Sequence, residues 1–505
     1  MKKLIVWMFI LISIFSLIPT GMPIVKATPS SWYVATAADH GSDSNSGRDI
    51  THPLLTLQKA INRSANSDTI YVRRGVYTYH HLISVNRSGT STQYFTIKNY
   101  NGERPIIDGT YAPHNNCLNS SLQIKGTRSY IRITGLTFSH SYKGGITLFP
   151  TQSHVRIDNC TIQNCSSFAI KLQQASHCSI ENCYIYNNMN NWSTIGISQE
   201  TISIESSNYC NIYRNYLYKN HCENIDLKGS TSWSNVYRNR INTTSSKTIK
   251  AGCVYYGGPG VMLDTQGYIE HNISVYKNLI YGNNSGITID NEQATNRYEN
   301  ISVYNNIINI TNQSGGAPDF EGRIGILIAR FGGSTAVNKD IKIYMNTVNL
   351  GTNNIYNAFQ MGSVAKPLYK NYIRRLTINN NIFTISRSTS PYYGILTFYG
   401  LNITDGATYI SLNNNLYNDS IAGQTPRISW TDGTYTKSSP TKWGNHPLFT
   451  KPKYKSPHPP FNFQLNSTSP CIDAATSSLH APTDVIGIAR PQVNGYDIGA
   501  YEYHS

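Results

Sequence analysis

Short segments in which apolar and polar residues alternate recur along most of the chain. Residues 224–229 are one of them, with the apolar Ile225 and Leu227 two positions apart. The others are residues 145–148, 169–172, 201–204, 260–263, 286–289 and 325–328. This alternation predicts β-strands that turn one face to a core, and the residues between the apolar positions then turn to the opposite face.

A second unit of six residues, apolar at both ends and usually with Asn near its middle, recurs between residues 133 and 417. Its starts are 23 to 40 residues apart. The shortest spacing is about one turn of a parallel β-helix, so the excess predicts loops between strands. Helical periodicity is absent from these repeats, and Val, Ile, Tyr, Thr and Asn dominate them, as in β-structure. We therefore expect an all-β solenoid, a parallel β-helix of about nine to ten coils.

Two positions of the six-residue unit hold the same polar residue in coil after coil. One holds Asn at residues 215, 239, 278, 306, 346, 381 and 415, and the other holds Tyr at residues 213, 237, 276, 304 and 344. An Asn side chain turned inward at a bend bonds to the backbone and to its neighbours in the coils above and below. We interpret the Asn residues as structural rather than as ligands, and we expect the Tyr rings to stack.

The two ends of the chain do not share this rhythm. Residues 51–65 carry a helix pattern, with Thr51 as the expected cap and Pro53 in the first turn. A helix there would shield the open end of the array. After about residue 420 the repeats fade, and the remaining segment is expected to cap the last coil. The predicted parts are an N-terminal cap with the first coils (28–110), the β-helix repeats (111–420) and a C-terminal capping segment (421–505).

Residues 1–27 have the form of a secretory signal peptide, with two lysines, an apolar run and a small-residue exit at Val25-Lys26-Ala27. The formal net charge is +15, and removal of three lysines and no acid leaves +12. A basic exported protein suits an acidic polymer, although general solubility and adsorption to an anionic wall explain the charge equally well. Because no later run of about 18 apolar residues occurs, we expect a secreted or surface-associated monomer without a transmembrane anchor and without a nucleic-acid partner.

Nine cysteines in an exported chain usually indicate disulfides. Their odd number, and their concentration between Cys160 and Cys253, argue against a simple disulfide framework. Cys160 and Cys183 occupy the same place in consecutive repeats, so we favour a buried ladder of thiols. The absence of paired CxxC motifs argues against zinc.

Strands stacked in parallel about 4.8 Å apart would align their outward positions into columns. One column would hold Lys171, Ser203, Asp226, Met262 and Thr288, and the next would hold Gln173, Glu205, Lys228, Asp264 and Asp290. The second column concentrates charge in a chain of which only 14% is charged. We interpret it as a site, the alternative being a solvated ladder in which Glu205, Lys228 and Asp264 pair as neighbours.

The residue types in these columns fit two reactions on a polysaccharide. Oxygen ligands such as Glu205, Glu223 and Asp226 are of the kind that hold calcium, and Lys228 is the candidate base for β-elimination if its pKa is lowered. In hydrolysis, carboxylates among Asp226, Asp264 and Asp290 would act as acid and as base or nucleophile. The expected catalytic residues are Lys228, Asp226 and Asp264, and the expected substrate-binding residues are Lys171, Trp192, Trp233, Tyr255, Tyr256 and Asp290. The loop aromatics among them have an equally good interpretation as packing residues.

The opening of the chain resembles the start of exported right-handed parallel β-helix proteins, in the runs 53–61 (PLLTLQKAI), 68–77 (DTIYVRRGVY) and 104–109 (RPIIDG). Over this opening and the repeats, the chain is similar to calcium-dependent pectate lyases of the family-9 type. Those enzymes carry an Asp-Asp-Gly-x-Asp calcium motif where this chain has residues 222–226 (CENID). Their catalytic lysine lies in a strand resembling residues 260–263, where this chain has Met262.

The resemblance implies a right-handed β-helix, export, calcium and a polysaccharide partner. Residues 223–230 (ENIDLKGS) also look like a Glu-x-Ile-Asp-Ile-Lys-x-Gly motif of exported β-helix proteins. We expect a polysaccharide lyase acting on an acidic, pectate-like glycan, with Lys228 as base in place of the unmatched family lysine. The alternatives are a glycoside hydrolase and a non-catalytic glycan-binding surface protein.

Overall fold

The computed structural model describes most of the chain after the predicted signal peptide, and residues 1–27 lie outside it. It describes residues 28–504 except 111–119, 190–199, 245–247, 251–252, 256–257, 267–268, 292–295, 312–323, 330–337, 352–356, 363–372, 387–393, 400–409, 420–424, 457–461 and 493.

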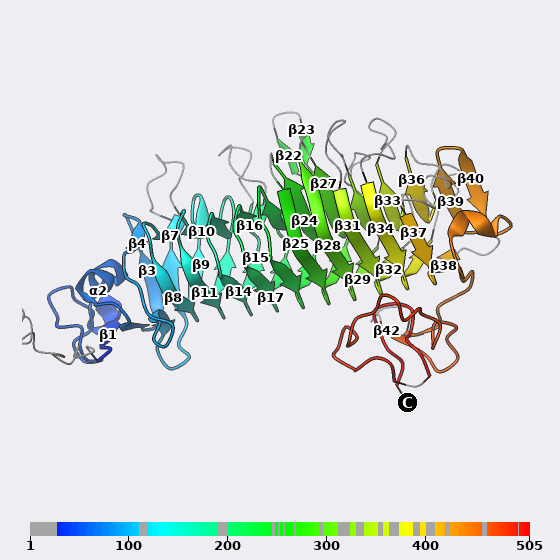
Figure 1. Cartoon of the computed structure of the whole chain (residues 1–505). Coiled ribbons are helices and arrows are strands. Elements are labelled where there is room, and N and C mark those ends of the chain that lie inside the picture. Colours follow the sequence, from blue (N-terminus) through cyan, green and yellow to red (C-terminus); the bar gives the residue numbers. More distant parts are fainter. Residues whose placement is uncertain are drawn as a thin grey trace, which may run out of the picture.

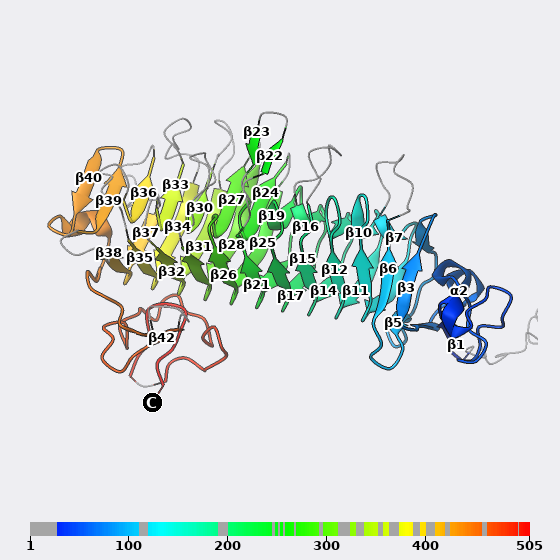
Figure 2. The same cartoon turned by 180° about the vertical axis from the view of Figure 1, so that it is seen from behind.

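Three long sheets run side by side along the molecule, and each coil of the chain passes through all three (Figures 1 and 2). Sheet A contains β1 (Ser31–Val34), β2 (Thr69–Val72), β5 (Phe95–Asn99), β8 (Ser129–Thr134), β11 (Ser153–Asp158), β14 (Ser179–Glu181), β17 (Asn211–Tyr213), β20 (Asn235–Tyr237), β25 (Ile269–Tyr276), β28 (Arg297–Tyr304), β31 (Asn338–Tyr344), β34 (Ile373–Asn379) and β37 (Ile410–Asn413). Sheet B contains β3 (Gly75–Thr78), β6 (Pro105–Asp108), β9 (Thr137–Ser139), β12 (Thr161–Gln163), β15 (Tyr184–Tyr186), β18 (Tyr216–Tyr218), β21 (Arg240–Asn242), β26 (Leu279–Gly282), β29 (Ile307–Ile310), β32 (Thr347–Leu350), β35 (Ile382–Ile385) and β38 (Leu416–Asp419).

Sheet C forms the third side. It contains β4 (Ile83–Val85), β7 (Ser120–Ile124), β10 (Gly144–Leu148), β13 (Ile170–Gln173), β16 (Glu200–Glu205), β19 (Glu223–Lys228), β24 (Val261–Thr265), β27 (Ile287–Asn291), β30 (Ile326–Ile328), β33 (Phe359–Met361), β36 (Leu396–Phe398), β39 (Arg427–Trp430) and β40 (Gly433–Thr436). Two antiparallel hairpins, β22 (Thr248–Lys250) with β23 (Cys253–Tyr255) and β41 (Tyr454–Ser456) with β42 (Asn462–Leu465), lie outside these sheets.

The predicted fold is confirmed, because successive strands of each sheet pair in parallel, apart from the final β39–β40 hairpin. The predicted nine to ten coils are too few, since the sheets hold 12 and 13 strands. Residues 28–110, predicted to hold a cap and the first coils, contribute strands to all three sheets although their sequence does not share the repeat. Backbone pairing decides whether a strand belongs to a coil, and in residues 28–110 the side-chain pattern does not reveal this pairing.

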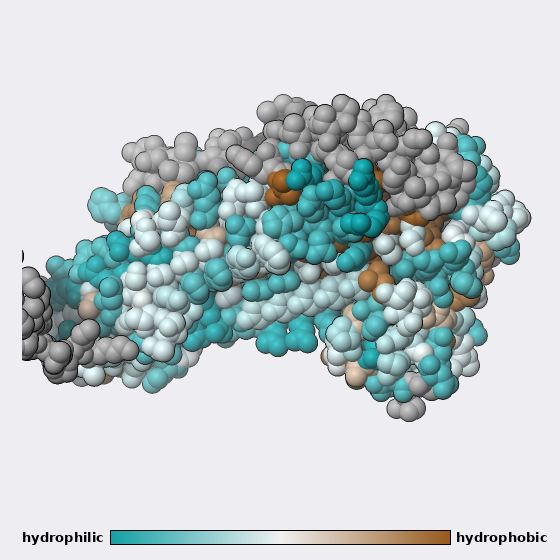
Figure 3. All heavy atoms as spheres, in the orientation of Figure 1, coloured by the Kyte–Doolittle hydropathy of each residue, from teal (hydrophilic) through white to brown (hydrophobic). Residues whose placement is uncertain are grey.

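The interior is a continuous column of apolar side chains. Ile225 and Leu227 of β19 are fully buried in it, with their register partners in neighbouring strands. The outer surface seen in Figure 3 is largely hydrophilic where the structure describes it. Burial of about 25 cal/mol per Å² of apolar surface stabilises such a stack, so a modest overall apolar content of 39% suffices.

The Asn ladder is confirmed. From Asn215 to Asn415, each side-chain amide donates to the Oδ1 of the next Asn at 3.0 Å, and each backbone N–H bonds to that same oxygen. The same amide also donates to a backbone carbonyl of the previous coil, as Asn278 does to Val236 O at 2.9 Å. The Tyr rings stack as predicted, with centroids 4.8 to 4.9 Å apart from Tyr213 to Tyr344.

The N-terminal helix is shorter than predicted. Helix α2 spans Leu57–Arg63, and its cap is Thr56, whose hydroxyl accepts from the backbone N–H of Lys59, rather than Thr51. Leu54 lies in a short parallel bridge with Val34, and its N–H donates to Tyr33 O at 2.8 Å. Backbone pairing of Leu54 with β1 therefore delays the start of the helix. Helix α2 packs against β1, β2 and β4 at the first coils, as expected of a cap.

The closing part of the chain divides into two pieces with different positions. Trp430 and Trp443 join the apolar core at the end of the stack, beside the 3-10 helix η3 (Pro440–Trp443). The segment from β41 onward instead lies along the side of the last coils (Figure 1). There Asn380 and Asn414 donate to the carbonyls of Thr476 and Ala474 at 3.0 and 2.9 Å. Only the first piece caps the last coil. The second piece accepts hydrogen bonds from the turns between sheets A and B.

The seven cysteines whose side chains the structure describes have free, buried thiols. Cys160 and Cys183 follow one another at the turns after β11 and β14, as the thiol ladder requires. Among the described residues, no helix is long and apolar enough to cross a membrane.

Candidate functional site

Sheet C brings the two predicted columns into register. Ser203, Asp226, Met262 and Thr288 are successive partners, as are Glu205, Lys228, Asp264 and Asp290. Lys171 and Gln173 continue the two columns on β13. The prediction of which residues share a column is therefore confirmed.

The solvated-ladder alternative is wrong. Lys228 is 9% exposed, Asp264 6%, and Asp226 and Asp290 are each 1% exposed. Glu205 pairs with Lys171 at 2.8 Å rather than with Lys228. Ionisable groups that are buried to this extent either pair with a group of opposite charge or take their neutral form.

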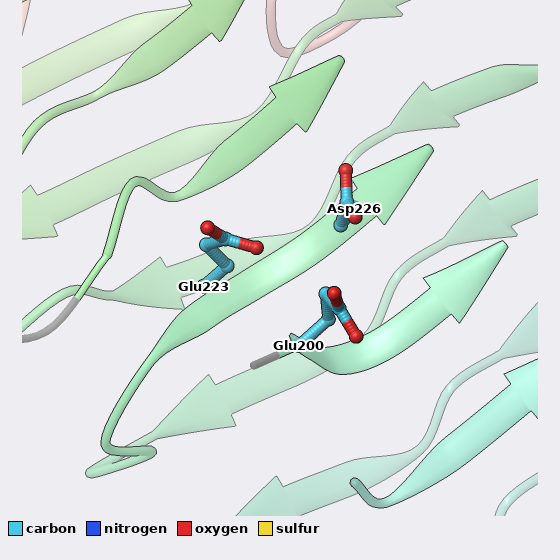
Figure 4. Close-up of side chains that lie close together, drawn as sticks. All are labelled: Glu200, Glu223 and Asp226. Atoms are coloured by element: carbon cyan, nitrogen blue, oxygen red, sulfur yellow. The ribbon is translucent and has the colours of Figure 1, made fainter. Parts of the chain in front are cut away.

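Three carboxylates gather at the start of β19. Glu223 and Asp226 project from β19, and Glu200 projects from the neighbouring strand β16 (Figure 4). One oxygen atom from each of the three lies within 4.8 Å of the others. Glu200 and Glu223 are register partners, so the pairing of β16 with β19 brings them together. The chain just before β24 lies directly on this strand, because a Cβ at Gly258 would stand 2.6 Å from the backbone nitrogen of Glu223.

Lys228 places its ammonium against this carboxylate cluster. Its Nζ forms an ion pair with Glu200 Oε1 and lies 3.8 Å from Asp226 Oδ2. Burial favours the neutral amine, but the negative charges of Asp226, Glu200 and Glu223 outweigh it and raise the pKa of Lys228 above its usual value. The structure therefore holds Lys228 as an ammonium ion, whereas the sequence interpretation required a lowered pKa for a base.

The predicted calcium ligand Glu205 lies apart from this cluster. It is at the far end of β16, where its carboxylate binds Lys171 at 2.8 Å and accepts from Gln173 at 3.5 Å. Glu200 at the near end of the same strand joins Glu223 and Asp226 instead. Lys171, expected to bind substrate, is therefore engaged with Glu205.

Asp264 and Asp290 continue the charged column on β24 and β27. Their Cα atoms are direct partners, and Gln266 donates to Asp264 Oδ2 at 2.8 Å. Glu270 on β25 is fully buried, and neither of its carboxyl oxygens has a hydrogen-bond partner among the described residues. Burial first, and then the charges of Asp226 and Asp264, raise the pKa of Glu270 well above its usual value and favour its neutral form.

Of the loop aromatics, only Trp233 has a described side chain. Its ring stacks on Tyr209 with centroids 5.9 Å apart, meets His271 edge-on at 5.7 Å, and is 49% exposed. Packing in a column of rings therefore accounts for its position. Trp192 and Tyr256 lie outside the described residues, and so does the side chain of Tyr255 on β23.

Two acids at the site were missed from the sequence. Glu200 stands at the first position of a strand, and its signal was the Glu-Thr-Ile-Ser-Ile run in which it precedes the apolar alternation. Glu270 carries no such signal, because a lone acid in a strand, here between Ile269 and His271, is ordinarily expected to be exposed. Only the closed interior of the coil shows that it points inward.

The carboxylate cluster fits a calcium ion by donor type. Its three side chains offer hard oxygen ligands, which calcium prefers. They come from two adjacent strands of a rigid sheet, which fixes the relation between Glu200 and Glu223. In this structure the ammonium of Lys228 balances the negative charge of the carboxylates, which is the role that a bound calcium ion would have.

The three parallel sheets wound as successive coils are the architecture of right-handed parallel β-helix proteins. The family model described as Pel9A-like, right handed beta helix region, matches residues 32–315, more than half of the chain. The chain belongs to this family.

Among curated relatives, the pectate lyase PEL9 of Emericella nidulans is 38% identical over 73 residues, which make up 14% of this chain and 18% of that enzyme. The matched segment thus spans less than a fifth of that relative. Among solved structures, XylC in complex with xylose is similar over 94% of this chain and 98% of its own, at a TM-score of 0.55 and 14% identity. The pectate lyase Pel9A is similar over 95% and 97%, at a TM-score of 0.49 and 14% identity. The likeness to XylC shows the fold alone.

Proposed function

We propose that this chain is an exported polysaccharide lyase that cleaves an acidic, pectate-like glycan by calcium-assisted β-elimination. The observation that carries the proposal is the cluster of Glu200, Glu223 and Asp226 with Lys228 directly beside it on sheet C. Membership of the Pel9A-like family and the short match to a pectate lyase support the substrate class.

Glu200, Glu223 and Asp226 would hold the calcium ion. When bound, calcium supplies positive charge that neutralises the substrate carboxylate and makes the adjacent C–H more acidic. Asp264 and Asp290 continue the column one and two strands further along the sheet, and in this proposal they would serve the neighbouring sugar units.

Lys228 is the base of the proposed reaction. Its Nζ takes the proton from the carbon beside the substrate carboxylate. The electron pair of that C–H bond forms a carbon–carbon double bond, the glycosidic C–O bond breaks, and the leaving oxygen takes a proton from water. For this step the amine must be neutral. As calcium ligands, Glu200 and Asp226 would no longer stabilise the ammonium form of Lys228, and its burial would favour the neutral amine.

The test is an assay of the full chain on polygalacturonate with calcium and with a chelator. Unsaturated products that absorb in the ultraviolet, and that are lost with chelator, are the expected result. Lys228→Ala should abolish them, whereas the matched variant Lys339→Ala, which removes a more exposed pair with Glu299 on sheet A, should retain activity. Full lyase activity in Lys228→Ala defeats the assignment of the base. New reducing ends without ultraviolet absorbance would indicate a hydrolase, and binding without either product would indicate a glycan-binding protein.

A further inference from the structure

A groove lies on sheet B, on a different side of the coil from the carboxylate cluster. It occupies about 770 Å³ in the N-terminal half of the molecule. It runs over the outer face of β6, β9, β12 and β15 and over the turns that lead into them from sheet A. Pockets of this size are typical of small-molecule and oligosaccharide sites. None of its lining residues belongs to the candidate site on sheet C.

The groove exists because large side chains at its ends flank small ones at its centre. In one column of sheet B, Ile106, Thr137, Thr161 and Tyr184 are successive register partners. The side chains of Thr137 and Thr161 are short, so they leave an open space between Ile106 and the ring of Tyr184. At about 4.8 Å per coil, the two threonine positions leave room for a flat ring.

Tyr184 forms one wall of the groove with an aromatic face. On its C-terminal side its ring stacks on Tyr216, with centroids 5.1 Å apart and planes 20° from parallel. On its other side its register partner is Thr161, and the side chain is 39% exposed. The column of tyrosine rings therefore ends at Tyr184. The tilted ring of Tyr186, whose centroid is 4.8 Å from that of Tyr184, lies beside it, and both side chains line the groove. An aromatic face with a polar edge suits the apolar face of a pyranose ring.

The charged side chains of the lining are mainly basic. Lys98, Arg104 and Arg132 line the groove, and Glu103 is the one acid among the lining residues. The Glu103 carboxylate is bound by Arg73, which is not a lining residue, at 3.0 Å. Arg132 is fixed in place by two hydrogen bonds of 2.8 Å to Asp158, and Arg104 is exposed without an ion pair to any described residue. Guanidinium groups bind carboxylates with a planar, two-pronged geometry.

We propose that this groove is a second glycan-binding site, which holds a uronate-containing polysaccharide by stacking one sugar on Tyr184 and pairing the carboxylate of another sugar of the same polymer with Arg104. The groove would anchor the chain to an acidic polymer at a distance from the carboxylate cluster. This inference goes beyond the proposed lyase activity and does not depend on it.

The experiment measures the affinity of the full chain for polygalacturonate and for fully methyl-esterified pectin. Tyr184→Ala is compared with Tyr209→Ala, because Tyr209 is similarly exposed at 45% but has both ring faces covered by His177 and Trp233. Arg104→Glu is compared with Arg374→Glu, an exposed arginine on β34 in another part of the molecule. Circular dichroism checks that each variant is folded.

We expect Tyr184→Ala to weaken binding to both polymers about five- to tenfold. Arg104→Glu should weaken binding to polygalacturonate and leave binding to the esterified polymer nearly unchanged. The two control variants should bind as the parent does. Equal affinity of Tyr184→Ala and Tyr209→Ala overturns the site, and an equal effect of Arg104→Glu on both polymers overturns its preference for acidic glycans. If no unsaturated product forms but the Tyr184 and Arg104 effects are found, the lyase proposal fails while the groove stands.

Discussion

Replacement of Lys228 by Met tests the charge balance of the candidate site. Met keeps much of the aliphatic length of the lysine side chain but removes the ammonium that pairs with Glu200 and lies 3.8 Å from Asp226. Three carboxylates with oxygens within 4.8 Å of one another would then have no counter-charge from residue 228.

The size of the effect follows from burial. The Lys228 and Glu200 side chains are 11% and 7% exposed, so solvent screens their interaction little. Breaking a buried pair by removing one partner costs about 3–5 kcal/mol, because the remaining charge stays buried. Calcium at 100 times its dissociation constant would restore about 2.7 kcal/mol, since it binds the folded state. The variant should therefore be less stable than the parent in chelator and should regain stability with calcium.

The assay is chemical denaturation followed by circular dichroism, in chelator and in calcium. Lys171→Met is the matched control, because it removes the same charge from a pair whose side chains are 20% and 31% exposed. A surface pair of this kind contributes about 0–1 kcal/mol. If the two variants lose equal stability in chelator, or if calcium stabilises both to the same extent, the buried charge cluster does not act as described.

Three further predictions concern the interior and the pH dependence. Because the pKa of Glu270 is raised in the folded state, its carboxyl group contributes fully to protein stability below its pKa in the unfolded chain, about 4.3. This contribution is lost as the pH rises, at about 1.4 kcal/mol for each unit of pKa difference between the two states. Glu270→Gln should therefore match the parent at pH 4 and exceed it at pH 7 in denaturant titrations, and equality at both pH values would contradict the assignment. Asn278→Ala should lower the free energy of unfolding by about 2–4 kcal/mol, because it leaves the Asn239 amide and the Val236 carbonyl unpaired. The control Asn300→Ala, at an exposed position, should lower it by less than about 0.5 kcal/mol. Equal losses of stability in thermal melts would refute the structural role of the Asn ladder. Because Lys228 must be a neutral amine to act as the base, the lyase rate should rise with pH as the ammonium loses its proton. A rate profile that is flat with pH would exclude Lys228 as the base.

The repeats of this sequence predict the fold because their signal is local. Alternation such as Ile225 and Leu227 fixes which face of a strand is buried, and the Asn residues mark the same bend in each coil. Equal register then follows, which is why the column of Glu205, Lys228, Asp264 and Asp290 was predicted correctly. The helix start was not, because the backbone pairing of Leu54 with β1 is a contact between distant residues.

The sequence by itself determined the coil, its core and the columns of sheet C, since each depends on spacing within one repeat. Only the tertiary structure decided that Glu200 rather than Glu205 joins Glu223 and Asp226, and that Glu270 lies inside the coil. It also decided the charge state of Lys228, because a pKa depends on which groups approach through space and how far water is excluded. Those distances arise from the stacking of separate coils, and no single repeat contains them.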